Sequence, residues 1–111
     1  MRKIEQNIVG AFLAGQTARQ SNTSTDGKSL FLHGNEIARF EHDDERCELW
    51  VTLAGWPSPT TRSRLNALAR LWSETNTLPF VVWQSKGRQF IATTFNSVER
   101  ELDPNQWVRV V

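Results

Sequence analysis

Residues 55–72, GWPSPTTRSRLNALARLW, combine hydroxyl and arginine side chains at what the sequence predicts to be the start of a helix. Ser58 suits the N-cap, and Pro59 suits the first helical position, where the missing N–H of proline costs nothing. The unpaired backbone N–H groups and the positive dipole end of a helix start attract anions. This segment is therefore a candidate site for phosphate recognition.

Two interpretations of this helix start remain open. In the first, hydroxyls donate to one phosphate of a nucleic acid while arginines pair with its neighbours, and Trp50 adds a stacking ring. This candidate nucleic-acid or anion site consists of Thr60, Thr61, Arg62 and Arg64, with Lys86 and Arg88 from a predicted hairpin tip. In the second, the threonines serve only the helix end, while Arg64 covers Leu68 and binds a strand carbonyl. We favour the structural interpretation and keep anion binding as the alternative.

Catalytic and metal-binding arrangements are not indicated. His33 and His42 do not stand at ligand spacing from other ligand types, and the acidic run 41–45 lacks the regular spacing of a calcium loop. Cys47 falls in an alternating strand pattern, which predicts a small buried residue and no nucleophile. The sequence has no glycine-rich phosphate loop after a strand and no G-x-S-x-G segment. We therefore expect a protein without catalytic residues, bound metal or cofactor.

Five tryptophans in 111 residues are the strongest positive indication of function. Trp72 lies on the apolar face of a predicted helix and Trp56 is expected to anchor a turn, so both are predicted to belong to the core. Trp50, Trp83 and Trp107 lie on predicted strands whose opposite faces already hold apolar side chains. If their own face is uncovered, they form an apolar patch, and tryptophan is enriched at the centres of interfaces. These three residues are the candidate protein interface.

The elements that must position these residues follow from hydrophobic periodicity and turn residues. Ile4, Ile8 and Phe12 recur at helical spacing and predict a helix over 2–14, within which Gly10 is expected to mark the close approach of another backbone. The predicted β segments are 22–25, 28–33, 36–41, 47–54, a hairpin over 80–95, and 107–111.

Turn residues complete this order. Asp26-Gly27 predicts a type I′ turn, residues 34–35 suit a second tight turn, and Lys86-Gly87 is placed near a hairpin tip. The segment 96–106 is expected to be irregular. The predicted order α-β-β-β-β-α-β-β-β, with separate helices and runs of strands, indicates an α+β fold.

Length and composition restrict the class of protein. A chain of 111 residues fits one domain, 1–111, and can bury a core without disulfide or metal. The hydrophobic content of 39% and charged content of 23% are typical of a globular protein. A formal net charge of +1 favours neither a broadly basic nucleic-acid binder nor a DNA mimic. With one cysteine and no apolar run of membrane length, we expect a cytosolic protein without a membrane partner.

Two stretches, NTSTDGKSLFLHGNEIARF and LWVTLAGWPSPTTRSRLNAL, resemble a widespread group of small proteins of tailed bacteriophages. The resemblance covers roughly the first two-thirds of the chain. The matching residues are Asn22, Thr23, Leu32, His33, Gly34, Asn35, Ile37, Ala38, Trp56, Thr60, Thr61, Arg64, Leu65, Asn66, Ala67 and Leu68. The resemblance implies a phage or prophage origin, hence the host cytosol, and it carries over no catalytic residue.

The sequence supports two hypotheses of different classes. The first is a non-catalytic phage accessory protein that binds a protein: a host factor, a host defence component, another phage protein or a second copy of itself. The second is a small nucleic-acid-binding protein that uses the predicted helix start. The second requires a shared basic face made of Arg62, Arg64, Lys86, Arg88 and Arg109.

Overall fold

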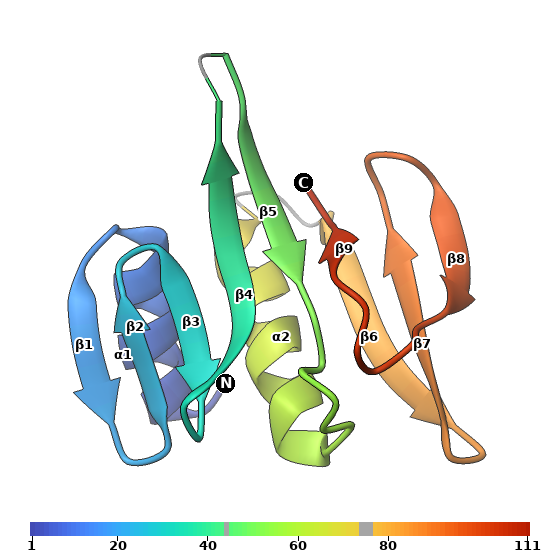
Figure 1. The fold of residues 1–111 in the computed structure, drawn as a ribbon, viewed down its shortest axis with the longest axis horizontal. Helices are drawn as coiled ribbons and strands as arrows, with labels where there is room; N and C mark the ends of the chain where they lie inside the picture. Colours follow the sequence, from blue (N-terminus) through green and yellow to red (C-terminus); the bar gives the residue numbers. More distant parts are fainter. Residues whose placement is uncertain (44, 74–76) are drawn as a thin grey trace.

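A computed structural model describes residues 1–43, 45–73 and 77–111, in which helices pack on one side of an antiparallel sheet (Figure 1). These residues form two helices and nine strands. In chain order they are α1 (Lys3–Leu13), β1 (Thr17–Gln20), β2 (Thr23–Asp26), β3 (Ser29–Leu32), β4 (Asn35–His42), β5 (Cys47–Val51), α2 (Pro59–Trp72), β6 (Phe80–Ser85), β7 (Arg88–Thr93), β8 (Val98–Glu101) and β9 (Val108–Arg109). The predicted α+β class is confirmed.

The strands form two sheets. Six strands lie in the order β1-β2-β3-β4-β5-β9, and three in the order β6-β7-β8, with antiparallel neighbours throughout. Both helices lie behind the six-stranded sheet in Figure 1, and no helix of the described residues crosses its front. One core joins Phe12 of α1, Leu68 of α2, Leu30 of β3 and Ile91 of β7. The sheet therefore has one face buried by helices and one open face.

Helix α1 is amphipathic, as its periodicity predicts. Ile8, Val9 and Phe12 are buried, and the Phe12 ring stacks on Phe40 of β4 with centroids 4.6 Å apart. Gly15 ends the helix with a φ of 70°, in the left-handed region that favours glycine.

The expectation that Gly10 marks the close approach of another backbone is wrong. A Cβ added at this position would meet no atom within 4 Å beyond the adjoining helical backbone. We expect Gly10→Ala to raise the free energy of unfolding by about 0.5–1 kcal/mol, because alanine loses less conformational freedom in a helix. Urea unfolding at unchanged m-value measures this gain. A loss of stability would show that α1 requires glycine here.

The two tight turns of the first hairpins are built differently. His33 and Gly34 have φ of 52° and 79°, which suits a type I′ turn, one residue earlier than the predicted turn at 34–35. The prediction of a type I′ turn at Asp26-Gly27 is wrong, because only Gly27 has positive φ. The carboxylate of Asp26 closes that turn by accepting two backbone N–H groups. Gly27 is required there, since a Cβ would lie 2.7 Å from a carbonyl oxygen of the α1–β1 turn.

Two strands, β1 and β8, lie outside the predicted set, and β8 occupies part of the segment expected to be irregular. Both are edge strands of four residues with mostly exposed side chains. These two strands pair on one side and contribute little to the core, so their sequences need not alternate apolar and polar residues. The sequences TARQ and VERE therefore lack the periodicity on which strand prediction depends.

Cys47 is exposed, which corrects its predicted place in the core. Leu49 and Val51 on the same strand are fully buried. The β4–β5 hairpin projects beyond the helices (Figure 1), so the start of β5 has no core to pack against. The alternating pattern correctly predicts which side chains of β5 face the same way, but the strand extends beyond the core, so Cys47 is exposed.

Candidate functional site

The start of α2 uses its hydroxyl and arginine donors within the protein. The N-cap Ser58 accepts the Thr61 N–H at 3.1 Å, and buried Thr61 donates its hydroxyl to the Trp56 carbonyl at 3.0 Å. Arg62 donates to a carbonyl of the preceding turn at 3.0 Å and to Gln89 of β7 at 2.8 Å. These bonds cap the helix and attach it to the second sheet.

Arg64 lies in a buried polar cluster between α1, α2 and β2. Its side chain is 3% exposed, and its Nη1 lies 2.9 Å from Oε2 of Glu5, which is equally buried. Its Nε donates to the Thr23 hydroxyl at 3.0 Å and its Nη2 to the Asn22 side-chain oxygen at 3.3 Å. Ser63 donates a further hydrogen bond to Glu5 at 2.6 Å. In this position Arg64 does not reach an external phosphate, and its partners are side chains and not the strand carbonyl expected.

The surroundings of Glu5 act on its pKa in two opposite directions. Burial raises the pKa of Glu5, but hydrogen bonds from Ser63, Arg64 and the Arg2 backbone, with the charge of Arg64, outweigh burial. The pKa of Glu5 therefore falls below its ordinary value of 4.5.

We expect acid to destabilise the protein through Glu5. Because its folded pKa is lower than its unfolded pKa, its contribution to stability is complete above the unfolded value and is lost as the pH falls through the folded value. Urea unfolding measured from about pH 7 down to about pH 3 should show a shallower decline for Glu5→Gln than for the original protein. Glu101→Gln, which removes an exposed carboxyl with a lowered pKa, should keep most of the decline. Equal declines for Glu5→Gln and the original protein would contradict this assignment.

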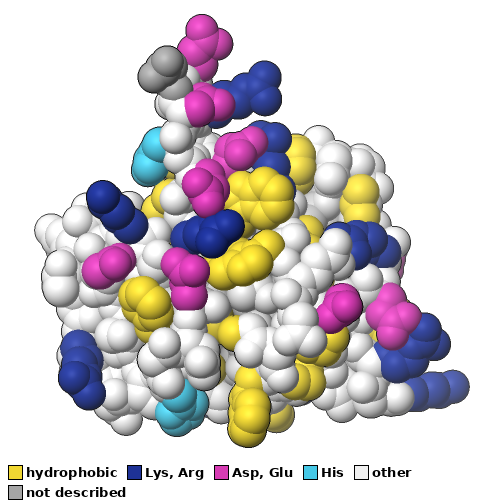
Figure 2. All heavy atoms as spheres, in the orientation of Figure 1, with side chains coloured by type: hydrophobic (Ala, Val, Ile, Leu, Met, Phe, Trp, Pro, Cys, Tyr) yellow, Lys and Arg dark blue, Asp and Glu magenta, His cyan; other side chains and the backbone are white. Residues whose placement is uncertain are grey.

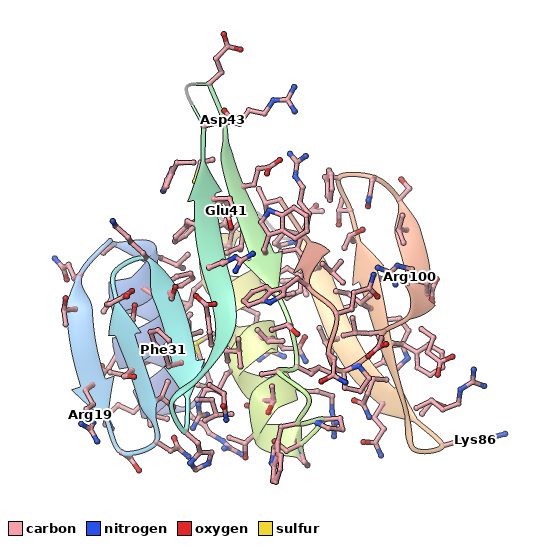
Figure 3. All side chains as sticks on the ribbon, viewed as in Figure 1. Arg19, Phe31, Glu41, Asp43, Lys86 and Arg100 are labelled. Atoms are coloured by element: carbon pink, nitrogen blue, oxygen red, sulfur yellow. The ribbon has the colours of Figure 1, made fainter. Side chains whose placement is uncertain are left out.

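The remaining basic residues of the nucleic-acid hypothesis lie at the surface, where two of them pair with carboxylates. Lys86 extends away from the body at the tip of the β6–β7 hairpin (Figure 3). Arg88 pairs with Glu101 of β8, and Arg109 pairs with a carboxylate of β5 at 2.8 Å. Because Arg64 is buried, the five cations that this hypothesis requires do not share one exposed face. Of the hydroxyls, Thr60 is partly exposed.

The open face of the six-stranded sheet carries two of the candidate tryptophans. Arg39 of β4, Trp50 of β5 and Arg109 of β9 stand directly opposite one another in the strand register. The Arg39 guanidinium lies over the Trp107 ring, with its Cζ 4.3 Å from the ring centroid. We refer to Arg39, Trp50, Trp107 and Arg109 as the tryptophan–arginine patch.

Carboxylates hold the arginines of this patch in place. Arg39 Nε lies 2.8 Å from Glu41 Oε1, and Arg109 Nη1 lies 2.8 Å from Glu48 Oε2. Trp50 Nε1 donates to Glu48 at 3.4 Å. Such partly exposed pairs contribute about 0–1 kcal/mol each to stability, so their main effect is to orient the surface. Figure 2 shows hydrophobic side chains interleaved with acidic and basic ones on this face, below the projecting hairpin.

Trp83 lies on a different surface from the other two candidate tryptophans. Trp50 and Trp107 line the same groove, whereas Trp83 lies on β6 in the second sheet. Its ring stacks with Phe90 of β7 at a centroid distance of 5.7 Å, and Val81 on the same face of β6 is 38% exposed. The predicted interface residues therefore divide into two surfaces.

Trp56 is 67% exposed, so its predicted place in the core is wrong. Ala54 and Gly55, with φ of 55° and 73°, reverse the chain after β5 and bring the Trp56 ring to the surface. The ring lines a pocket of about 360 Å³ together with Leu32 and His33. Trp72, in contrast, is partly buried and packs on Phe40 as part of the core.

Within the described ranges, no group of three or more His, Cys, Asp or Glu side chains is arranged to hold a metal ion. Among the described helices, none is both long enough and apolar enough to cross a membrane.

The fold and surface define a small α+β protein with helices on one side of a sheet and a tryptophan–arginine patch on the other. Residues 1–109 match the sequence model of the Kyanoviridae Gp96 protein family, and the chain belongs to this family of phage proteins. The match extends beyond the two stretches on which the phage resemblance depends. Comparison with curated proteins and with solved structures gives no match.

Proposed function

We propose that this phage protein is a non-catalytic accessory protein that binds a protein partner through the tryptophan–arginine patch. The supporting observation is that Trp50 and Trp107 stay partly exposed on the open sheet face, while the helices bury the opposite face. Tryptophan and arginine are the side chains most often responsible for binding energy at protein interfaces. The partner is a host factor or a component of host defence; a second copy of the chain is the alternative.

The electrostatics of the patch favour a protein over a nucleic acid. A nucleic-acid surface must neutralise phosphates with lysine or arginine. Here Arg39 and Arg109 are already paired with Glu41 and Glu48, so the surroundings of Trp50 offer little positive charge to a phosphate backbone. Stacking of a base on Trp50 would bring phosphates close to these carboxylates, which opposes binding.

Affinity capture of the tagged protein from lysate of infected host cells, with and without nuclease treatment, tests this proposal. We expect one protein to be retained, to be lost with Trp50→Ala and to persist with Trp83→Ala. The second variant is a matched control, because it removes the same side chain from a partly exposed position in the other sheet. Recovery that vanishes with nuclease and is indifferent to Trp50 would contradict the proposal and favour nucleic-acid binding.

A further inference from the structure

A groove of about 320 Å³ lies beside the two tryptophans, at the base of the projecting β4–β5 hairpin. Its lining includes two indole rings, one guanidinium and three carboxylates. These residues are Trp50, Trp107, Arg39, Glu41, Asp43 and Glu48, and His42 completes the lining. Figure 3 shows Glu41 and Asp43 following one another along the hairpin toward its tip. The groove thus combines aromatic faces with one carboxylate, that of Asp43, beyond the two that are paired with arginines.

We propose that this groove receives an arginine side chain of the partner, so that the partner presents a basic segment to this face. The inference rests on the proposed function and specifies the chemistry of the protein that binds. Indole faces attract cations, and the planar guanidinium both stacks on a ring and pairs with a carboxylate. An acidic or uncharged segment would leave Asp43, which no ion pair of the described residues engages, without a counter-charge.

The protein already binds guanidinium groups in this way on the same surface. Arg39 lies over Trp107 at 4.3 Å while its Nε is 2.8 Å from Glu41. Arg109 lies over the exposed Phe95 ring at 5.0 Å while it pairs with a β5 carboxylate. Each arrangement combines one aromatic face with one carboxylate, and the groove offers the same combination once more.

Trp50 and Asp43 are the groups that remain for an incoming guanidinium. Across the part of the chain that the structure describes, no cation lies over the Trp50 ring and no ion pair engages Asp43. Asp43 Oδ1 accepts the backbone N–H groups of Glu45 and Arg46 at 3.0 and 2.7 Å, which fixes its carboxylate on the hairpin. These two groups supply an aromatic face and an anion at one groove.

The test is a titration of the ¹⁵N-labelled full chain, followed through the indole N–H resonances in two-dimensional NMR. The probe is an acetylated, amidated peptide of four Gly-Ser-Arg repeats, compared with the same peptide carrying citrulline or glutamate in place of arginine. The arginine peptide should shift the Trp50 and Trp107 resonances and leave Trp83 unmoved; Trp50→Phe assigns the first resonance. The citrulline and glutamate peptides should shift neither.

Variants of the protein test which side chains bind the arginine peptide. Trp50→Ala should weaken binding of the arginine peptide about tenfold, and Asp43→Asn about threefold, while Glu99→Gln on β8 should leave it unchanged. Added salt should weaken binding, because exposed charge pairs are screened. Equal shifts with the citrulline peptide, or shifts that depend only on protein concentration and so indicate a second copy, would overturn the inference.

The outcome separates this inference from the proposed function. If capture from lysate depends on Trp50 while the arginine peptide moves neither indole resonance, the patch still binds protein and the guanidinium inference is wrong. If the arginine peptide binds as expected while capture is indifferent to Trp50, the groove takes guanidinium groups but the proposed interface is wrong.

Discussion

Replacing Arg64 with methionine is expected to lower the free energy of unfolding by about 3–5 kcal/mol, because it leaves a buried carboxylate without its cation. Glu5 is 3% exposed at its side chain and is held by Arg64 at 2.9 Å. The substitution also removes the donors to Thr23 and Asn22, which attach α2 to the sheet. Urea unfolding monitored by circular dichroism measures the loss.

Two further variants show whether burial of the charge is responsible. Arg70→Met, at an exposed arginine of the same helix, should change stability by less than about 0.5 kcal/mol. The double variant Glu5→Leu with Arg64→Met should recover much of the loss, since an apolar pair needs no charge compensation. If Arg64→Met alone lowered the free energy of unfolding by less than about 1 kcal/mol, the buried polar cluster would not be holding α1, α2 and β2 together as its geometry indicates.

Replacing Asn66 with alanine is expected to cost about 2–4 kcal/mol, because two backbone groups of β6 lose their partners. Asn66 Nδ2 donates to the Val82 carbonyl at 2.8 Å, and the Val82 N–H donates to Asn66 Oδ1 at 2.9 Å. Val82 is 1% exposed and β6 is an edge of its sheet, so the amide of Asn66 pairs with this strand where another strand would otherwise lie. Thermal and urea unfolding measure the effect.

The matched variants for this site differ in the chemistry that they retain. Asn66→Asp keeps the shape but sets a carboxylate oxygen against the Val82 carbonyl, so it should destabilise at least as much as alanine. Asn7→Ala removes an exposed asparagine of α1 that donates to the exposed Gln20 side chain, and it should cost less than about 0.5 kcal/mol. An Asn66→Ala protein of unchanged stability would show that α2 docks on β6 through apolar contacts alone.

Periodicity and turn residues together were sufficient to predict the elements that contribute to the core. The apolar residues of α1 and β5 recur at helical and strand spacing, so each of these elements shows its buried face in its sequence. Strand β2, with the sequence TSTD, holds no apolar residue and was predictable only from the Asp26-Gly27 turn that follows it. Strands β1 and β8 bury almost nothing and therefore left no pattern. Cys47 shows the opposite error, because a strand pattern continued beyond the point where the helices end.

The site was predictable only where a residue's type determined its role. The capping function of Ser58 follows from local chemistry, and the structure shows the bond. The pairing of Arg64 with Glu5 joins residues 59 positions apart, and a single acidic residue in an amphipathic helix gives no sign of burial. Trp50 and Trp107 lie together, apart from Trp83, because β9 pairs with β5. Hydrophobic periodicity does not show which distant strands are neighbours in a sheet.

The most direct test of the tryptophan–arginine patch is calorimetric titration of the captured partner, purified, against the original protein, Trp50→Ala and Trp83→Ala. If the patch is the interface, Trp50→Ala should weaken the dissociation constant by about 30-fold or more, as expected for a residue that dominates binding energy. Trp83→Ala should leave it within about twofold. An unchanged dissociation constant for Trp50→Ala, or an equal loss for Trp83→Ala, would show that the partner binds elsewhere.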